Sequence, residues 1–290
     1  MKYAYYPCCS LKGTGRAYEE SLLAVFKALG IETEELDDWN CCGATAYMAV
    51  SSAAGFLMTA RNLALAEKQA HDLIAPCSGC YLALKKTQHY VAEYPVVAQQ
   101  VHEALQRGHM QYNGKAKVRH PLEVLFNDIG LDRLKQAVKA PLKAFKVAPY
   151  YGCQIIRPYA DFDDQTNPVL MDKLFQSLGA EVVKYPLKTH CCGGSLTGTI
   201  GEVGQRLSRI LLKEAQKRGA NIIATVCPLC QFNLDGYQDD ISDRWEPVRM
   251  PVVYFTQLIG LALGLAPGEL GLQRSIVSLE PLLEQQEVVA

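Results

Sequence analysis

Short apolar runs alternate with longer stretches of helical periodicity along the whole chain of 290 residues. In the first half the pattern predicts strands at residues 3–6, 31–36 and 73–75, and helices at residues 17–29 and 51–69. The first helix is the clearest, because Leu22, Phe26 and Leu29 fall on one face. Strands that alternate with helices in this way are typical of an α/β unit.

The second half repeats the same order of elements. It predicts strands at residues 146–151, 181–185 and 222–226, and helices at residues 168–178 and 202–218. A chain of this length can hold two domains that each bury a core. We therefore expect an α/β fold of two tandem Rossmann-like modules, residues 1–145 and 146–290, related by pseudo-two-fold symmetry.

The cysteines follow the same duplication. Ten of the eleven form one five-member pattern written twice: a single cysteine, an adjacent Cys-Cys-Gly and a Cys-x-x-Cys. In each copy 34 residues separate the second group from the third, and these two groups recur 150 positions further on. The copies consist of Cys9, Cys41, Cys42, Cys77 and Cys80, and of Cys153, Cys191, Cys192, Cys227 and Cys230.

Each cysteine group falls where a predicted strand ends and a helix begins. In open α/β sheets this carboxyl edge is where ligands bind, close to helix N-termini that carry partial positive charge. We therefore expect the modules to present their cysteine loops at the carboxyl ends of the strands, where thiolates and anionic clusters are favoured.

The charge balance and the N-terminal sequence limit the classes of function and the compartment that we expect. With 29 basic and 30 acidic residues, the chain has no global field that favours nucleic acid. Residues 115–146 are locally basic and predict a solvated linker, either a plain exposed helical face or a docking surface for an acidic partner. The N-terminus lacks the apolar run of a secretory signal, so we expect a cytoplasmic protein. Its reduced thiols are then metal ligands or redox groups rather than disulfides.

The chemistry of the cysteines favours iron and sulfur. Neighbours such as Cys41 and Cys42 point to opposite sides of an extended segment, so they reach two metals of a cluster more readily than one ion. Five cysteines also exceed the four that a zinc ion or a cubane needs, so one thiolate is either spare or bridges two irons. The alternative from another class is a noncatalytic protein with two structural zinc sites.

The doubled cysteine sets and two further stretches of sequence resemble a known family. The two stretches are Tyr5-Tyr6-Pro7-Cys8-Cys9-Ser10-Leu11 and Cys227-Pro228-Leu229-Cys230-Gln231-Phe232-Asn233-Leu234. Together they resemble the B subunit of heterodisulfide reductase, whose repeat of the CCG domain covers nearly the whole chain. The resemblance implies two non-cubane 4Fe–4S clusters, one on each set of five cysteines, that together cleave a disulfide. In this interpretation Cys42 and Cys192 are catalytic as well as ligands.

The resemblance also implies partners. Electrons would arrive through a ferredoxin-like iron–sulfur partner of the C type, joined to a flavoprotein partner of the A type. The chain itself shows no G-x-G-x-x-G after a strand, so a partner must supply flavin chemistry. The substrate would be a small-molecule or carrier-bound disulfide, and no nucleic acid is expected.

Five further residues are candidates with alternatives. His190 is either a proton donor or a histidine satisfied at a strand end, and Trp39 either shields a cluster or simply packs. Arg157 and Lys188 are candidates to hold an anionic group of the substrate. Cys8 stands where the family usually has glycine, so it is an alternative ligand, a redox-active thiol or a small buried residue.

The second candidate function is a CCG subunit that couples a succinate or fumarate oxidoreductase to membrane quinone. Its support is the apolar segment 252–266, which falls short of the roughly 20 apolar residues that span a bilayer. We expect this segment to be a buried helix, with a short contact at the inner face of the membrane as the alternative.

Overall fold

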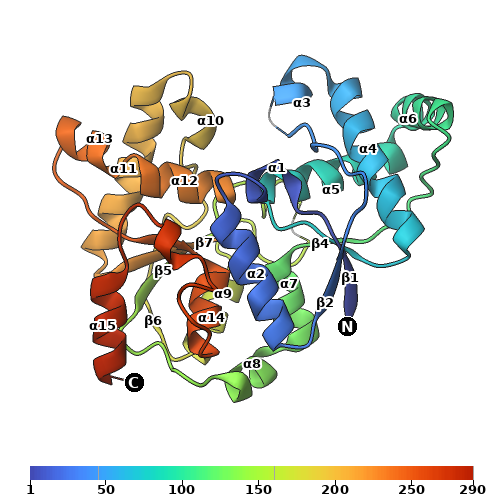
Figure 1. The fold of residues 1–290 in the computed structure, drawn as a ribbon. Helices are drawn as coiled ribbons and strands as arrows, with labels where there is room; N and C mark the ends of the chain where they lie inside the picture. Colours follow the sequence, from blue (N-terminus) through green and yellow to red (C-terminus); the bar gives the residue numbers. More distant parts are fainter. Residues whose placement is uncertain (45, 160, 290) are drawn as a thin grey trace.

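The computed structural model describes the chain except residues 45, 160 and 290. It contains two four-stranded parallel sheets of the same strand order, β2-β1-β3-β4 and β6-β5-β7-β8 (Figure 1). The first sheet consists of β1 (Lys2–Tyr5), β2 (Glu32–Glu35), β3 (Leu73–Ile74) and β4 (Val118–Arg119). The second consists of β5 (Lys146–Tyr150), β6 (Glu181–Val182), β7 (Ile222–Thr225) and β8 (Val252–Tyr254). The shared order confirms the predicted α/β fold of two Rossmann-like repeats.

The helices between the strands repeat less closely. The first sheet carries α1 (Cys8–Leu11), α2 (Arg16–Ala28), α3 (Ala46–Val50), α4 (Ser52–Gln69), α5 (Ser78–Glu93) and α6 (Pro95–Arg107). The second carries α9 (Leu170–Ser177), α10 (Gly194–Thr197), α11 (Gly201–Lys217), α12 (Pro228–Gly236) and α13 (Gln238–Arg244). The four predicted helices correspond to α2, α4, α9 and α11. Local chemistry fixes their ends: the Ser51 hydroxyl accepts the Ala54 amide hydrogen bond at the start of α4, at 3.3 Å.

The basic segment 115–146 is not the solvated linker that its composition predicts. It holds β4, α7 (Pro121–Val124), the π-helical turn η1 (Leu125–Ile129) and α8 (Leu131–Ala137). Leu122 and Leu125 are fully buried, and Arg119 forms ion pairs with three carboxylates, those of Asp72, Glu123 and Asp128. The basic residues around β4 dominated the pattern and hid its short buried strand.

The apolar segment 252–266 is buried, as predicted, but it is not one helix. It divides into β8 and α14 (Phe255–Ala262), and a 3-10 turn η2 (Leu272–Arg274) and α15 (Glu280–Val289) follow. Nearly all of β8 and α14 lies in the core, which removes this segment as a membrane contact. In the described part of the chain, no helix has both the length and the apolar character needed to cross a membrane.

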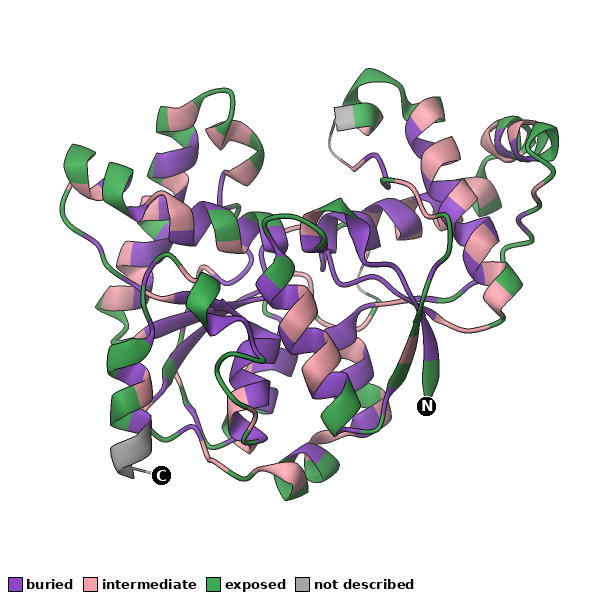
Figure 2. Cartoon of the chain, in the orientation of Figure 1, coloured by how far each residue is buried: buried purple, intermediate pink, exposed green. Residues whose placement is uncertain are grey.

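Each module packs one of its helices against the other module. From the second, α14 packs against α2 of the first, where Tyr18 stacks on Tyr254 at 4.6 Å between ring centroids and the hydroxyls of Ser21 and Thr256 lie 2.7 Å apart. From the first, α8 packs against α9 of the second. One continuous core therefore includes residues of both modules (Figure 2). This exchange fixes how the carboxyl edges of the two sheets face each other.

Candidate metal centres

Each cysteine group lies at the carboxyl end of a strand, as the sequence predicts. Cys8 and Cys9 open α1 just after β1, and the two Cys-Cys pairs lie in the loops that follow β2 and β6. Cys77 and Cys227 occupy the N-cap positions of α5 and α12. The unpaired amides of a helix N-terminus favour a thiolate at such a position.

The first site is a group of thiols buried under an exposed rim. The sulfurs of Cys8, Cys77 and Cys80 lie within 4.8 Å of one another and all three residues are buried. Cys42 is also buried, with its Sγ 3.1 Å from that of Cys80. Cys9 and Cys41 are exposed. The structure thus brings Cys8 into the buried group and leaves Cys9, the predicted ligand, at the rim.

The second site has the same plan without the extra thiol. Cys192 and Cys230 have their sulfurs 3.5 Å apart, and both are buried with Cys227. Cys153 is half-buried and Cys191 is exposed. All five predicted ligands line one cavity of about 40 Å³.

Backbone amides surround the sulfurs of the Cys-Cys pairs. In the first pair the amides of Gly43 and Ala44 donate to the sulfurs two residues earlier, each at 3.4 Å. In the second pair Gly193 and Gly194 do the same at 3.3 Å. Gly193 has φ +80°, and a Cβ there would lie 2.8 Å from the Cα of Gly204, so the loop requires glycine. Amide donors to sulfur are typical of iron–sulfur sites.

Hydrogen bonds between the crowded thiols lower the pKa of some and raise the pKa of others. Hydrogen bonds from Cys41 and Cys80 hold the pKa of Cys42 well below its usual value, and the hydrogen bond from Cys153 lowers the pKa of Cys191 to about 6. The pKa of each donor thiol rises for the same reason. Because metals bind the thiolate, both donor sets fit a metal or a cluster.

The two sites adjoin across the interface between the modules. Ser78, inside the first Cys-x-x-Cys, donates to the carbonyl of Val226, directly before the second, at 3.4 Å. Ser78 and Gln154 also line the small cavity of the second site. The Oε1 of Gln154 lies 3.1 Å from the position that a Cβ on Gly79 would take. The N-terminal turns of α5 and α12 therefore approach one another from opposite modules (Figure 1).

Two tyrosines that the sequence analysis missed hold the Cys-Cys loops. The hydroxyl of Tyr6 donates to the carbonyl of Asn40 at 2.8 Å, and that of Tyr150 donates to the carbonyl of His190 at 2.7 Å. Each acceptor directly precedes a Cys-Cys pair. An alignment of the two copies could have found them, because each tyrosine stands three residues before the first cysteine of its copy.

The structure separates the candidates around the sites. His190 is exposed and its role as a proton donor stays a prediction. Trp39 packs edge-on against Tyr6, with ring centroids 5.6 Å apart, and so covers an aromatic ring beside the first site. Both observations place these residues at the rim rather than among the buried sulfurs.

The two candidate anion ligands differ. Arg157 is exposed, donates to the carbonyl of Thr189 and adds a minor lowering to the pKa of Cys191, so it lies beside the second site. Lys188 is buried, and its Nζ lies 2.8 Å from both the Pro168 carbonyl and Asp172 Oδ1. This ammonium has two hydrogen-bond partners inside the fold, so the structure does not support the expectation that Lys188 holds substrate.

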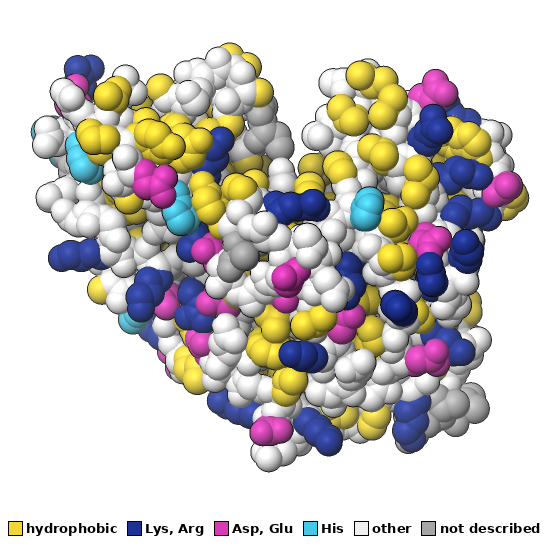
Figure 3. All heavy atoms as spheres, turned by 180° about the vertical axis from the view of Figure 1, so that it is seen from behind, with side chains coloured by type: hydrophobic (Ala, Val, Ile, Leu, Met, Phe, Trp, Pro, Cys, Tyr) yellow, Lys and Arg dark blue, Asp and Glu magenta, His cyan; other side chains and the backbone are white. Residues whose placement is uncertain are grey.

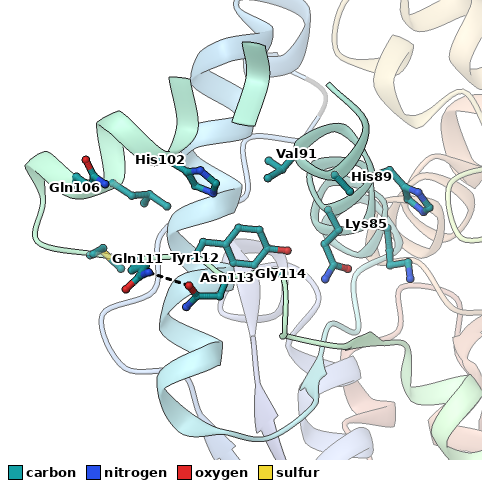
Figure 4. A pocket seen from close by; sticks show the side chains of 13 residues that line it. Lys85, His89, Val91, His102, Gln106, Gln111, Tyr112, Asn113 and Gly114 are labelled. Carbon is teal, nitrogen blue, oxygen red and sulfur yellow. Dashed lines mark hydrogen bonds between the residues drawn. The ribbon is translucent and has the colours of Figure 1, made fainter. Parts of the chain in front are cut away.

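A larger cavity of about 690 Å³ lies away from both sites, between the C-terminal half of α5, α6 and residues 108–114 (Figure 4). Lys85, His89, His102 and Tyr112 are among the residues that line it. The helix at the matching place in the second module, α13, has 7 residues against 13 in α6. Its volume alone does not connect it to the cysteine chemistry.

Comparison with known proteins agrees with the duplication. The family model for the cysteine-rich domain named CCG matches residues 3–85 and 147–235, one match in each module. The 8-methylmenaquinol:fumarate reductase membrane anchor subunit of Wolinella succinogenes is 35% identical, over 95% of this chain and 97% of that protein. A protein of Archaeoglobus profundus named as like the B subunit of heterodisulfide reductase is 32% identical, over 92% of each chain.

A solved structure shares the fold. A hypothetical protein from Helicobacter pylori superposes with a TM-score of 0.77 at 15% identity, over 96% of this chain and 52% of that one. The chain therefore spans about half of the length of that protein. At this identity the likeness concerns the fold alone.

Proposed function

This chain belongs to the family of cysteine-rich CCG domain proteins, and on that premise we propose that it is the catalytic iron–sulfur subunit of a heterodisulfide reductase-like complex. It reduces a disulfide, or forms one in the reverse direction. The names of its relatives support membership of a reductase complex as one subunit. The observation that supports a disulfide as the substrate is that the two thiol sites lie next to each other.

In this proposal each set of five cysteines holds one 4Fe–4S cluster of non-cubane type. Four thiols would suffice for a cubane, so the fifth thiol and the adjacent Cys-Cys pairs support a more open arrangement. The buried sulfurs, led by Cys42 in one site and Cys192 in the other, bind from the protein side, and the amides of the glycine turns stabilise their charge. The exposed Cys41 and Cys191 stand where a substrate can approach.

Two adjoining sites match the electron count of the reaction. Cleaving a disulfide takes two electrons and two protons and yields two thiols. A cluster, when bound, passes one electron at a time. The protein's part is to hold one sulfur of the substrate beside each site, with the contact between Ser78 and Val226 keeping the sites together. His190, which is exposed and directly precedes Cys191, is the proposed proton donor.

Electrons must enter through partner subunits, for which the surface offers an apolar platform. Residues 41–60 and 191–201 contain no charged side chain. In these two tips Tyr47, Val50 and Ile200 are exposed, Val50 to 88%. The tips rise from the cysteine edges of the two modules, and apolar side chains are exposed on both upper lobes among polar atoms (Figure 3). We assign them to a ferredoxin-like subunit that is joined in turn to a flavoprotein, and anaerobic isolation of the intact complex tests this.

The second candidate is the quinone-coupling subunit of a succinate or fumarate oxidoreductase. The relative at 35% identity, named as a membrane anchor subunit, favours it. The segment that supported a membrane contact in the sequence is buried, so such a contact would have to use the exposed tips. Recovery in the membrane fraction together with reduction of a quinone analogue would decide for this candidate.

The experiment that tests the proposal is anaerobic purification followed by iron and sulfide analysis, electron paramagnetic resonance and disulfide assays. We expect iron and acid-labile sulfide at both sites, and signals that change when a dithiol is added. Two zinc ions per chain without sulfide would overturn the proposal.

A further inference from the structure

Cys8 lies inside the first site although it is outside the repeated set of ten cysteines. It is fully buried, and its sulfur is within 4.8 Å of the sulfurs of both Cys77 and Cys80. Two sulfurs bound to one metal at about 2.3 Å stand roughly 3.8 Å apart. The spacing of these three sulfurs is therefore close to what a shared metal needs.

The second module shows what the site is like without this thiol. Gly152 occupies the matching position, with φ +70° against +62° for Cys8. A Cβ on Gly152 would lie 3.1 Å from the sulfur of Cys230, the counterpart of Cys80. The backbone therefore aims this position at the sulfurs in both modules, and only the first module places a side chain there.

The backbone at Cys8 also argues against simple space filling. A side chain in the left-handed region costs about 1–2 kcal/mol, a strain that glycine avoids. The backbone at Cys8 is therefore strained, and the strained conformation places the Cys8 sulfur among the sulfurs of the first site. A buried apolar residue would gain no contact of that kind.

We propose that Cys8 is a sixth thiolate donor of the first site, so that the two sites are chemically inequivalent. The proposal rests on the proposed function only in requiring metal at the site. On binding, the Cys8 thiol gives its proton to solvent and its sulfur joins the buried donors Cys42, Cys77 and Cys80. The second site has only three buried donors, Cys192, Cys227 and Cys230.

An added thiolate places negative charge beside the metal and stabilises its oxidised form. The first site should therefore have a lower reduction potential than the second. One-electron transfers to the two sulfurs of a substrate would then occur at different potentials, with the second site reduced first.

Exchanging the two residues tests this inference. Cys8→Gly removes the thiol and relieves the backbone strain, so we expect a folded protein. Gly152→Cys adds the matching thiol to the second site. The measurement is a redox titration of each paramagnetic signal in the anaerobic protein, together with its iron and sulfide content. Neither readout depends on turnover.

We expect Cys8→Gly to raise the potential of one signal and leave the other in place, and Gly152→Cys to lower the other signal alone. Unchanged potentials and line shapes in Cys8→Gly would overturn the inference, whether or not Gly152→Cys folds. If the purified protein holds only zinc, the proposed function fails separately. Cobalt substitution then tests Cys8 by itself, because loss of its thiolate weakens the sulfur-to-cobalt absorption and an unchanged spectrum rules Cys8 out.

Discussion

His120 contacts both modules, because its ring stacks on Phe255 of the second with centroids 6.3 Å apart. Its protonation should destabilise the fold. The ring is fully buried, with Nε2 2.9 Å from the carbonyl oxygen of Pro76, and Nδ1 accepts a hydrogen bond from the Leu122 amide at 3.1 Å. A ring that donates through Nε2 and accepts through Nδ1 is neutral. Burial lowers the pKa of His120 to about 3, because a charged ring would lose water and the Leu122 bond.

The size of the effect follows from the difference between folded and unfolded states. In the unfolded chain a histidine has a pKa near 6.5, so below that pH the unfolded state binds a proton that the folded state refuses. The contribution of His120 to stability is therefore complete above about pH 6.5 and is lost as the pH falls toward about 3. Acidification from about pH 6.5 to about pH 5 should remove about 2 kcal/mol. For 290 residues this lowers the melting temperature by roughly 3 °C.

Anaerobic calorimetry at about pH 7.5 and about pH 5 measures this effect. In His120→Asn, which caps α7 without titrating, the fall in melting temperature on acidification should be roughly 3 °C smaller than in the wild type. Leu122→Ala is the matched control: it destabilises the same turn by about 2–5 kcal/mol but keeps the histidine, so its pH dependence should equal that of the wild type. An equal fall in His120→Asn and the wild type would refute the reasoning.

Three further predictions concern the sites. Cys42→Ser and Cys192→Ser should each deplete the metal of one site and abolish disulfide turnover; near-normal rates in both variants would contradict the two-site account. Gly193→Ala should cost about 2–3 kcal/mol and release metal from the second site, because the loop needs a left-handed residue with no room for a Cβ. Gly198→Ala, which faces open space, is its control, and similar metal loss in both would count against the steric argument. Lys188→Met should lower stability by about 3 kcal/mol by leaving a carboxylate unpaired, with KM for the disulfide unchanged; a large rise in KM would restore a role in substrate binding.

The sequence predicted the elements in which apolar residues recur with a clear period. It also predicted that the cysteines gather at the carboxyl edges of the sheets. The helix at residues 17–29 matches α2 because its apolar face repeats over a length of several turns. The pattern did not show β4, which lies in a stretch dominated by basic residues, or β8, whose apolar residues continue directly into α14. It predicted a helix over 252–266 because apolar composition is shared by buried strands and helices.

The exchange of α8 and α14 between modules, and the approach of the two sites that depends on it, arise from long-range packing. The composition of a single segment does not show which distant segment it packs against. The role of Cys8 was left open because a sequence gives no side-chain direction, and the left-handed backbone that aims it at Cys80 is visible only in three dimensions. Tyr6 and Tyr150 were accessible from the repeat, but only by an alignment of the two copies beyond their cysteines.

The central claim is that two polynuclear iron sites adjoin and serve one disulfide. The most direct measurement is electron paramagnetic resonance of the anaerobically purified protein at intermediate reduction, with and without a candidate dithiol. The account predicts two signals that broaden one another through space when both sites are paramagnetic, and that change together when the dithiol binds. A single signal, or two that neither interact nor respond together, would contradict it.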